Sequence, residues 1–564
     1  MPTVRQQIID DRVSQTVSLL QNSESEAFER FAHATFTGIS IHSFDDSDLV
    51  DGTQDKQIDA ITIVEDDGEA EIFVLSMKYT NGFSSNAIIL MRNGLNWIFN
   101  KPRPEIQAIA NVPFRDKVLE IRSVLSGYGP SNVSFRCALL TNGLTSEISS
   151  EYQQELTTML QEYDNGTFRS FEFANVGADE LVDLVNAAEK KDRRIDANIP
   201  IRYDANSPSL IKYHSQGLKG LVCTANARDI AKIVNDDDSG AVFDSNIRRF
   251  LGTRGSVNQD ILRTCSGTET SFQFWFLNNG ITVICDKFDP TTDPDDPHVK
   301  VQNMQIINGC QTATALALAA KSGHLKADAR VLLRIYETND PDLVDRIVLS
   351  TNNQNKISNR DLKANDSVQV DMEQAFALFN FWYERKTNQY RGLELPEGIK
   401  IVSNDIVGQC FLGIVLKRPA DARRRKYKVW SDSYDQIFTG QHVEPHVLSV
   451  LIYFAVQSRI SADSLNRIED ELRRKLAKSG VFHVARVVAN RWRQTDSWTQ
   501  GHDTLRTQIA ELQSAVGVLD PYIDEAIEFI AELIETNPAF TNDIDGALKS
   551  SLLEREITRE VRTT

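Results

Sequence analysis

Hydrophobic positions in the N-terminal third of the chain follow first a helical and then a strand period. Phe28, Phe31 and Ala32 recur at the spacing of one helix face. Two apolar runs follow, IDAITIV at 58–64 and EIFVLSMKY at 71–79, and the turn-rich EDDGEA joins them. Because helices and strands go on alternating, the pattern predicts an α/β sandwich. The further elements that it predicts are helices near 86–99 and 104–126, strands at 134–142 and 170–176, and a helix at 178–190.

A charged stretch, KKDRRIDANIP at 190–200, lacks apolar periodicity and marks a boundary between regions. Beyond it, short apolar strands such as VQNMQIING mix with helices such as TATALALAAKSG. From about residue 441 the periodicity becomes mainly helical. The sequence therefore predicts three regions: an α/β region at 1–190, a mixed α+β region at 200–440, and a helical region at 441–564.

The composition is that of a globular protein, with 41% hydrophobic and 25% charged residues. No stretch approaches the roughly 18 consecutive apolar residues of a membrane span, and the N-terminus lacks the pattern of a signal peptide. The six cysteines are scattered without a CxxC pair, which argues against a disulfide framework and a cysteine zinc site. We expect a cytoplasmic protein with reduced thiols and no membrane partner.

The net charge of −18 restricts how the chain could bind nucleic acid. Proteins that wrap nucleic acid usually carry a basic balance, although binding depends on the local field. Basic residues must therefore be concentrated locally, or metal ions must supply positive charge. The most basic segment, KRPADARRRKYK at 417–428, includes Tyr427 and has two interpretations, a solvated loop or a patch that contacts phosphates.

Candidate catalytic residues lie on the first two expected strands and on the helix before them. Asp59 begins the first strand, Lys78 lies on the second, and Glu29, with Glu26 as runner-up, lies in the helix EAFERFAHATF. Carboxylate oxygens suit Mg²⁺ or Mn²⁺, which can polarise a phosphodiester and activate a water. Because strand side chains alternate, Ser76 and Lys78 point to the same side. The set predicts a metal-dependent nuclease site.

The arrangement resembles the PD-(D/E)xK restriction-endonuclease-like superfamily, best over residues 20–80 and more loosely to about 185. The resemblance implies a restriction-endonuclease-like α/β/α fold for residues 1–190. It also implies Mg²⁺ (or Mn²⁺) as cofactor, and a homodimer, since such nucleases often pair to cut two strands.

Ser76 departs from the superfamily pattern, which has Glu or Gln two residues before the lysine. Residues 79–104 contain no Asp or Glu that could compensate. Asp51 and Asp55, in the loop before Asp59, could supply a substitute oxygen. The expected metal ligands are Asp59, Glu29 and Asp55, and the expected catalytic residues are Asp59, Lys78, Glu29 and Ser76.

Two other interpretations of this site stay open. Asp59 could only cap a strand, with Lys78 facing solvent at a sheet edge. The region could also keep the nuclease fold without its chemistry, which Ser76 favours. The chain would then bind nucleic acid or a nucleotide and act through a partner.

Polar residues of the central region cluster at expected turns and at the start of a helix. Asn279 and Gly280 form a turn between apolar strands, where Asn and Gly tolerate positive φ. Amide side chains can read base edges or fix loops, so both a recognition pocket and a structural role stay open. The first N–H groups of the helix that Gln311 and Thr312 open could bind an anion. The candidate binding residues are Asn279, Asn308, Gln311, Thr312, Asn353, Gln354 and Lys356.

These motifs, in order along residues 200–440, closely resemble the AIPR family of abortive infection phage resistance proteins. The segments that carry the resemblance are FDSNIRRFLG (243–252), VNQDILRT (257–264), FWFLNNGITVICD (274–286), IINGCQTATAL (306–316), STNNQNKISNRDL (350–362) and FWYERK (381–386). The resemblance implies bacterial anti-phage defence. Its proteins commonly carry a restriction-endonuclease-like N-terminal domain, which the central region would direct or restrain until a phage-derived trigger or defence partner acts.

Other chemistries have little support. His442 and His446 could share a helix face, but no third metal ligand is evident and a structural role is favoured. The chain has no GxxxxGK[ST] loop and no GxSxG turn, which disfavours a P-loop ATPase and acyl transfer. We expect an anti-phage nuclease that cleaves nucleic acid, with DNA favoured over RNA as the substrate.

Overall fold

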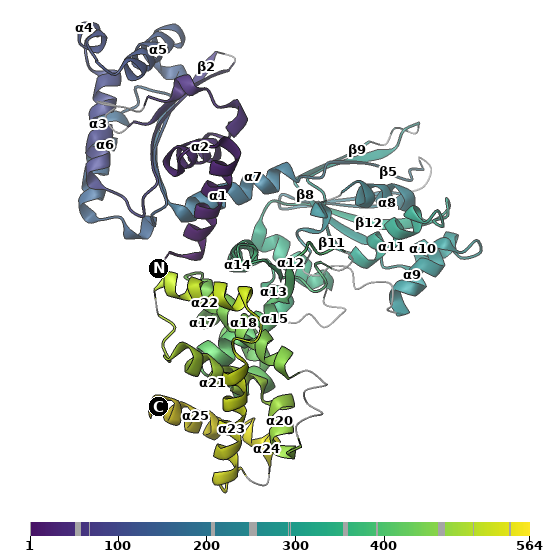
Figure 1. The fold of residues 1–564 in the computed structure, drawn as a ribbon. Helices are drawn as coiled ribbons and strands as arrows, with labels where there is room; N and C mark the ends of the chain where they lie inside the picture. The colour runs from purple at the N-terminus through teal and green to yellow at the C-terminus, as the bar shows by residue number, and fades with distance from the viewer. Residues whose placement is uncertain are drawn as a thin grey trace. The chain divides into compact units, whose positions relative to one another are not determined.

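The computed structural model divides the chain into two compact units, Pro2–Asp192 and Arg193–Thr564 (Figure 1). Five residues named above, Asp51, Asp55, Asn353, Gln354 and Lys356, lie outside the described residues. The structure describes residues 2–50, 58–66, 68–204, 209–237, 239–246, 256–291, 293, 295–352, 359–390, 393–460, 469–499, 501–540 and 543–563.

A four-stranded sheet in the order β1-β2-β3-β4 forms the centre of the first unit. β1 (Ala60–Asp66) pairs antiparallel with β2 (Glu69–Lys78). β3 (Val133–Thr141) and β4 (Ser170–Val176) continue the sheet in parallel. Parallel neighbours need crossover connections, which helices supply. The carboxyl ends of β2, β3 and β4 therefore meet at one edge of the sheet, and the start of the antiparallel β1 lies at the same edge.

Helices cover both faces of this sheet (Figure 1). Phe73 of β2 faces Phe36 of the α2 layer, with ring centroids 6.3 Å apart. Val74, the next residue along β2, packs in the opposite core with Leu95 and Phe114. One layer holds α1 (Val4–Leu20), α2 (Glu24–Thr37) and α7 (Ala178–Asp192), and the other holds α3 (Ser85–Phe99), α4 (Arg103–Gln107), α5 (Val112–Tyr128) and α6 (Ser150–Tyr163).

The second unit begins with small sheets whose strands come from distant parts of the chain. Its five-stranded sheet has the order β11-β8-β12-β7-β6, and its three-stranded sheet has the order β5-β10-β9. The strands of the larger sheet are β6 (Ile211–Ser215), β7 (Leu218–Asn226), β8 (Ile281–Cys285), β11 (Gln305–Asn308) and β12 (Arg330–Glu337). The others are β5 (Ala197–Pro200), β9 (Lys287–Thr291) and β10 (His298–Gln302), with the pair β13 (Phe381–Glu384) and β14 (Lys400–Ser403) further on.

The helices between Ala227 and Lys321 share one core with the strands. Ile281 of β8 and Leu333 of β12 are buried together with Leu316 of α11. The helices of this part are α8 (Ala227–Asp236), α9 (Ser256–Ser266), α10 (Phe274–Leu277), α11 (Cys310–Lys321), α12 (Pro341–Asn352), α13 (Asn359–Lys363) and α14 (Ser367–Ala377).

Among the described residues after residue 403, helices are the only regular secondary structure. α18 lies at the centre of this part, because both Val447 and Leu451 on it are buried. No helix of the described ranges is long and apolar enough to cross a membrane. The helices are α15 (Asn404–Cys410), a π-helix at Phe411–Val415, α16 (Pro419–Arg424), α17 (Tyr434–Ile437), α18 (Glu444–Arg459), α20 (Glu471–Ser479), α21 (Val481–Arg493), α22 (His502–Ser514), α23 (Asp520–Thr536), α24 (Ile544–Ala547) and α25 (Ser551–Thr563).

The mixed α/β class and the helical C-terminal region are thus confirmed. The α/β architecture alone does not identify a restriction-endonuclease-like fold. That more specific assignment of the first unit stays a prediction.

Candidate functional site

Asp59 and Lys78 converge at the edge where the carboxyl ends of the parallel strands meet. Asp59 directly precedes β1, and Lys78 is the last residue of β2. Lys78 Nζ lies 2.7 Å from Asp59 Oδ1, while the backbone N–H of Met77 donates to Asp59 Oδ2 at 2.6 Å. The Asp59 side chain is fully buried, whereas 33% of the Lys78 side chain is exposed. A buried carboxylate thus lies behind a cation that solvent can reach.

Two further polar atoms at this edge are buried and have no hydrogen-bond partner among the described residues. They are Ser76 Oγ on β2 and Asn142 Oδ1, directly after β3. The two strands pair in parallel, with Lys78 opposite Thr141. Unpaired buried polar atoms are rare and call for an explanation such as a water, an ion or a catalytic role. Asn142 was not among the residues predicted from sequence, although the polar end of SFRCALLTN could have indicated it.

Asp10 on α1 connects the ends of β2 and β3. Its Oδ1 accepts hydrogen bonds from the Tyr79 hydroxyl at 2.7 Å and from Asn142 Nδ2 at 2.8 Å. Tyr79 also stacks on Phe28 of α2, with ring centroids 5.3 Å apart. Burial, and then the hydrogen bond to Asp10, raise the pKa of Tyr79 well above its usual value. The contacts of Asp10 with Tyr79 and Asn142 therefore fix the ends of β2 and β3 beside the Asp59–Lys78 pair.

The two glutamates of α2 have different surroundings. Glu26 caps its own helix, since its Oε2 accepts from the Ser23 backbone N–H at 3.0 Å and from the Ser23 hydroxyl at 2.9 Å. Glu29 is half-buried on the same helix. No group of three or more His, Cys, Asp or Glu side chains in the described ranges could hold a metal ion. Because Asp55 lies outside those ranges, the expected metal set of Asp59, Glu29 and Asp55 stays a prediction.

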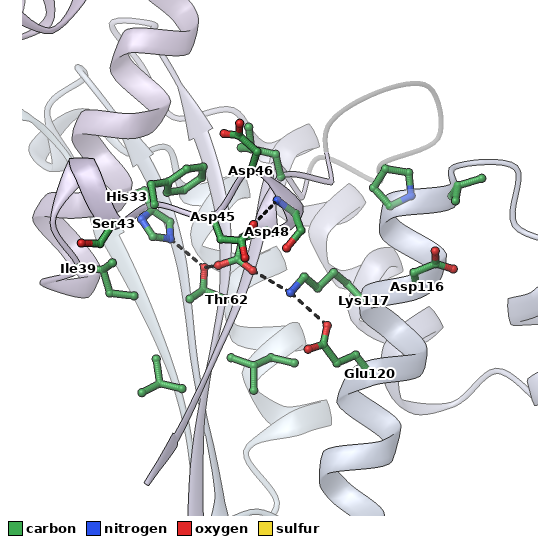
Figure 2. A pocket seen from close by; sticks show the side chains of 17 residues that line it. His33, Ile39, Ser43, Asp45, Asp46, Asp48, Thr62, Asp116, Lys117 and Glu120 are labelled. Atoms are coloured by element: carbon green, nitrogen blue, oxygen red, sulfur yellow. Dashed lines mark hydrogen bonds and ion pairs between the residues drawn. The ribbon is translucent and has the colours of Figure 1, made fainter. Parts of the chain in front are cut away.

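A pocket of about 610 Å³ in the same unit contains a chain of buried polar groups (Figure 2). Thr62 Oγ1 donates to Asp48 Oδ2 at 2.7 Å, and His33 Nε2 lies 2.8 Å from the same hydroxyl. Because the hydroxyl proton goes to Asp48, the network assigns the proton between His33 and Thr62 to His33 Nε2. Lys117 Nζ binds Asp48 at 2.7 Å and Glu120 at 3.1 Å. These contacts join α2, β1 and α5.

The electrostatics of this pocket do not suit a phosphate. Burial lowers the pKa of His33 to about 4, against the opposing effect of Asp48, so the ring is neutral at pH 7. One lysine, Lys117, lines the pocket together with five carboxylates. The carboxylates are Asp45, Asp46, Asp48, Asp116 and Glu120. A surface of this charge repels nucleic acid. The pocket is therefore not the expected nucleic-acid site, and it was not predicted from sequence.

In the second unit, the Asn-Gly steps at 279–280 and 308–309 pack against each other, backbone to backbone. The first joins the helix α10 to β8, so the predicted turn between two apolar strands is wrong on its N-terminal side, and the second joins β11 to α11. Gly280 has φ +78° and Gly309 has φ +85°. A Cβ atom on Gly309 would lie 2.7 Å from the Gly280 carbonyl oxygen. A Cβ atom on Gly280 would lie 2.5 Å from the Leu332 carbonyl oxygen. Both positions therefore need glycine, for conformation and for space.

The polar side chains around these turns mostly bind the protein itself. Asn278 Oδ1 accepts from the Gly280 N–H at 3.0 Å and from Thr312 Oγ1 at 3.2 Å. Asn308 Nδ2 donates to the Thr351 carbonyl at 2.6 Å. The structure therefore brings the Asn278–Gly280 turn and the start of α11 together, and it favours a loop-fixing role for Asn308 and Thr312.

A cation that was not predicted from sequence lies at the same turn. Arg334 of β12 donates from Nη1 to the Asn279 carbonyl at 3.0 Å. Its position in the alternating strand RVLLRIYE gave no indication of this contact, which depends on β12 pairing with β8. Gln311 is half-buried beside Thr312. The binding role of Asn279, Gln311 and the residues near them stays a prediction.

His446 has the structural role that was favoured for it. Its Nε2 lies 2.7 Å from the Ile437 carbonyl and its Nδ1 lies 3.1 Å from the His442 carbonyl. Burial lowers the pKa of His446 to about 4. The neutral ring carries a single N–H and can donate to only one of the two carbonyls, and the shorter distance favours donation from Nε2 to Ile437.

Comparison with known proteins supplies the context of these sites. Residues 243–538 match the family model described as AIPR protein. The matched segment contains both Asn-Gly turns and extends beyond residue 440 into the helices. No curated protein and no solved structure matches the chain. Because the family match covers more than half of the 564 residues, the chain belongs to the AIPR protein family.

Proposed function

We propose that this chain acts in abortive infection against phage, and that its first unit cleaves phosphodiester bonds of nucleic acid, DNA in preference to RNA. Membership of the AIPR family supports the anti-phage role. The proposal for cleavage depends on one observation, the 2.7 Å contact between Asp59 Oδ1 and Lys78 Nζ at the edge of the sheet.

The position of this pair supports the proposal. Open α/β sheets commonly bind ligands outside the carboxyl ends of their parallel strands. Lys78 is partly exposed there, so a phosphate oxygen can reach its ammonium group, whereas Asp59 is shielded behind it. In the proposed reaction, Lys78 stabilises negative charge on the phosphate or positions the attacking water.

The residues at this edge can hold Mg²⁺ or Mn²⁺ with few protein ligands. Mg²⁺ often keeps several waters and takes only one or two carboxylates together with substrate phosphates. Lys78 and Met77 donate to different oxygens of the Asp59 carboxylate, and each carboxylate oxygen can accept more than one contact. Ser76 Oγ, buried and without a partner among the described residues, can hold a metal-bound water. A bound cation supplies Lewis acidity toward the phosphate.

A second candidate function has its own support. Both oxygens of Asp59 already accept N–H donors, and its side chain is fully buried. The described residues also contain no group of three potential metal-binding side chains. These observations favour a protein that keeps the α/β/α architecture, binds nucleic acid and acts through a partner without cutting.

One experiment separates the two candidates. Purified full-length protein is incubated with labelled single-stranded DNA, duplex DNA and RNA in Mg²⁺, Mn²⁺ or EDTA, and both cleavage and retention on a gel are measured. The nuclease proposal expects metal-dependent cleavage that Asp59→Asn abolishes. Retention without cleavage in every metal would support the binding protein instead. Asp59→Asn suits this test because its amide oxygen can still accept the Met77 N–H.

A further inference from the structure

The segment 417–428 is the strongest concentration of positive charge in a chain of net charge −18. Seven of its twelve residues are Lys or Arg, and one, Asp421, is acidic. It forms the helix α16 and the start of a 3₁₀ helix at Lys426–Trp430. The contacts of the seven cations divide them into an inner and an outer set.

The inner set consists of Lys417, Arg418, Arg423 and Lys428, and its ion pairs stabilise the conformation of the segment. Lys428 Nζ and Arg418 Nη2 bind Asp421 Oδ2 at 2.9 Å and 2.6 Å. Burial alone would raise the pKa of Asp421, but the hydrogen bonds from Lys428 and Arg418 outweigh it and hold this pKa below the ordinary value. Asp421 therefore stays ionised and keeps two cations of the segment in place.

Two more cations attach the segment to other parts of the unit, one to a helix and one to the connection between α21 and α22. Arg423 Nη2 binds Asp545 Oδ1 of α24 at 2.5 Å, and Lys417 pairs with Asp496. These acidic groups neutralise the inner cations. The other three cations form the outer set, of which only Arg425 has an acidic partner among the described residues.

The outer set is Arg424, Arg425 and Lys426, which are consecutive and exposed, as is the adjoining Tyr427. The structure records no ion pair or hydrogen bond of the Arg424 or Lys426 side chain with another described residue. Arg425 reaches Asp421 only at 3.6 Å and is 47% exposed. Tyr427 is 61% exposed. Three neighbouring cations and one aromatic ring are thus exposed to solvent side by side, on a segment whose conformation the inner ion pairs stabilise.

We propose that the surface formed by Arg424, Arg425, Lys426 and Tyr427 binds single-stranded nucleic acid. Lys and Arg attract the phosphate backbone, and an exposed aromatic ring stacks on bases that are not already stacked in a duplex. The inference extends the proposed function to the second unit and does not require that the first unit cuts.

An anionic membrane is a weaker partner for the same charges. Membrane-surface segments combine basic residues with exposed apolar side chains that enter the lipid. The apolar residues that follow the outer set, Val429 and Trp430, are buried in the protein. Only Tyr427 would be available as an anchor.

The test measures binding of full-length protein in EDTA, so that its outcome does not depend on cleavage. The probes are fluorescein-labelled oligothymidylate and oligouridylate of about 20 nucleotides, a length that exceeds common binding sites. A duplex of the same length and phosphatidylserine vesicles serve as the competing partners. The variants are Arg424→Ala/Lys426→Ala, Tyr427→Ala and Tyr427→Phe. Lys475→Ala/Lys478→Ala is the charge-matched control, because both lysines are exposed on α20 of the same unit.

The proposal expects tighter binding of the single strands than of the duplex, and weaker binding by the Arg424→Ala/Lys426→Ala variant. The slope of log Kd against log salt should fall by roughly 1.4 in that variant, since each cation contributes about 0.7 on a single strand. Tyr427→Ala should weaken binding about tenfold while Tyr427→Phe retains it. The control should bind as wild type.

Three results would overturn the proposal. They are an absence of oligonucleotide binding by wild type, an unchanged salt slope in Arg424→Ala/Lys426→Ala, and a preference for the vesicles over the single strands. If the double variant does not fold, Lys426→Ala alone carries the test, with an expected reduction in slope of about 0.7.

Discussion

Asp59 and Lys78 are 19 residues apart in sequence, and Asp59 Oδ1 lies 2.7 Å from Lys78 Nζ across the start of β1 and the end of β2. The carboxylate is fully buried and the ammonium group is partly exposed. Removing one partner of a buried ion pair leaves the other charge uncompensated, which costs more than the pair itself contributes.

Lys78→Ala should therefore destabilise the protein by about 3 kcal/mol, because the buried Asp59 carboxylate loses its cation. Urea unfolding of the full chain measures the change in free energy. Lys101→Ala is the control, because Lys101 is as exposed as Lys78 (34% against 33%) but pairs with the surface residue Glu105. It should cost less than about 1 kcal/mol. Equal effects of the two variants would contradict the burial argument.

Ser76→Ala should stabilise the protein by about 1 kcal/mol, because it removes a buried hydroxyl that has no partner among the described residues. Ser449→Ala is the opposite case. The Ser449 hydroxyl is equally buried but donates to the His446 carbonyl at 2.9 Å, so its loss should destabilise by about 1 kcal/mol. A cleavage assay of Ser76→Ala adds a second measurement. Lost activity with gained stability identifies Ser76 as functional, whereas lost stability would show that its hydroxyl is satisfied in solution.

Gly309→Ala should destabilise the second unit by roughly 3 kcal/mol or more, from positive φ and from the close approach of its Cβ to the Gly280 carbonyl. Gly323→Ala is the matched control at φ +73°, because a Cβ there meets no atom within 4 Å. It should cost only about 1 kcal/mol from backbone conformation. Thermal unfolding compares the two variants. Similar losses of stability in the two variants would mean that the turns at Gly280 and Gly309 are not in contact.

The pKa of His33 gives a pH dependence with a definite sign. Burial lowers this pKa from about 6.5 in the unfolded chain to about 4 in the folded one. Between these values the unfolded state binds more protons, so stability rises with pH. The contribution of His33 is complete above pH 6.5 and is lost as the pH falls toward 4, by up to roughly 3 kcal/mol.

His33→Gln should reduce the loss of stability between pH 7 and pH 5, because the amide keeps a donor for Thr62 but cannot titrate. His42→Gln replaces an exposed histidine of the same unit as a control. Urea midpoints at the two pH values provide the measurement. The same pH dependence in His33→Gln and in wild type would refute the lowered pKa of His33.

Local signals allowed much of the first unit to be predicted. The turn EDDGEA fixes the pairing of two adjacent runs, so the strands expected at 58–64 and 71–79 correspond to β1 (Ala60–Asp66) and β2 (Glu69–Lys78). The convergence of Asp59 and Lys78 follows from that pairing. The helix expected at 104–126 is instead two helices, α4 and α5.

The break between α4 and α5 has a local cause. Asn111 Oδ1 caps α5 by accepting the Phe114 N–H at 2.9 Å, and Pro113 lies in the first turn, where its missing N–H costs nothing. Asn111 and Pro113 are visible in the sequence, but the apolar pattern continues through them and therefore predicted a single helix at 104–126.

Contacts between elements distant in sequence could not be predicted. Asn142 lies beside the site only because β3 pairs in parallel with β2 after a long crossover. Lys117 is buried in a charged helix, where sequence alone indicates exposure, and its partner Asp48 lies 69 positions earlier. Such pairs depend on how layers pack, and a single sequence does not record that packing.

The most direct test of the central claim compares the rates at which wild type, Lys78→Ala and Lys101→Ala cleave labelled DNA with enzyme in excess and Mg²⁺ or Mn²⁺ present. The account predicts that wild type and Lys101→Ala cleave equally and that Lys78→Ala is slower by about a hundredfold or more, because it lacks the cation that faces the phosphate. Equal rates for all three proteins, or no cleavage by wild type in either metal, would contradict it.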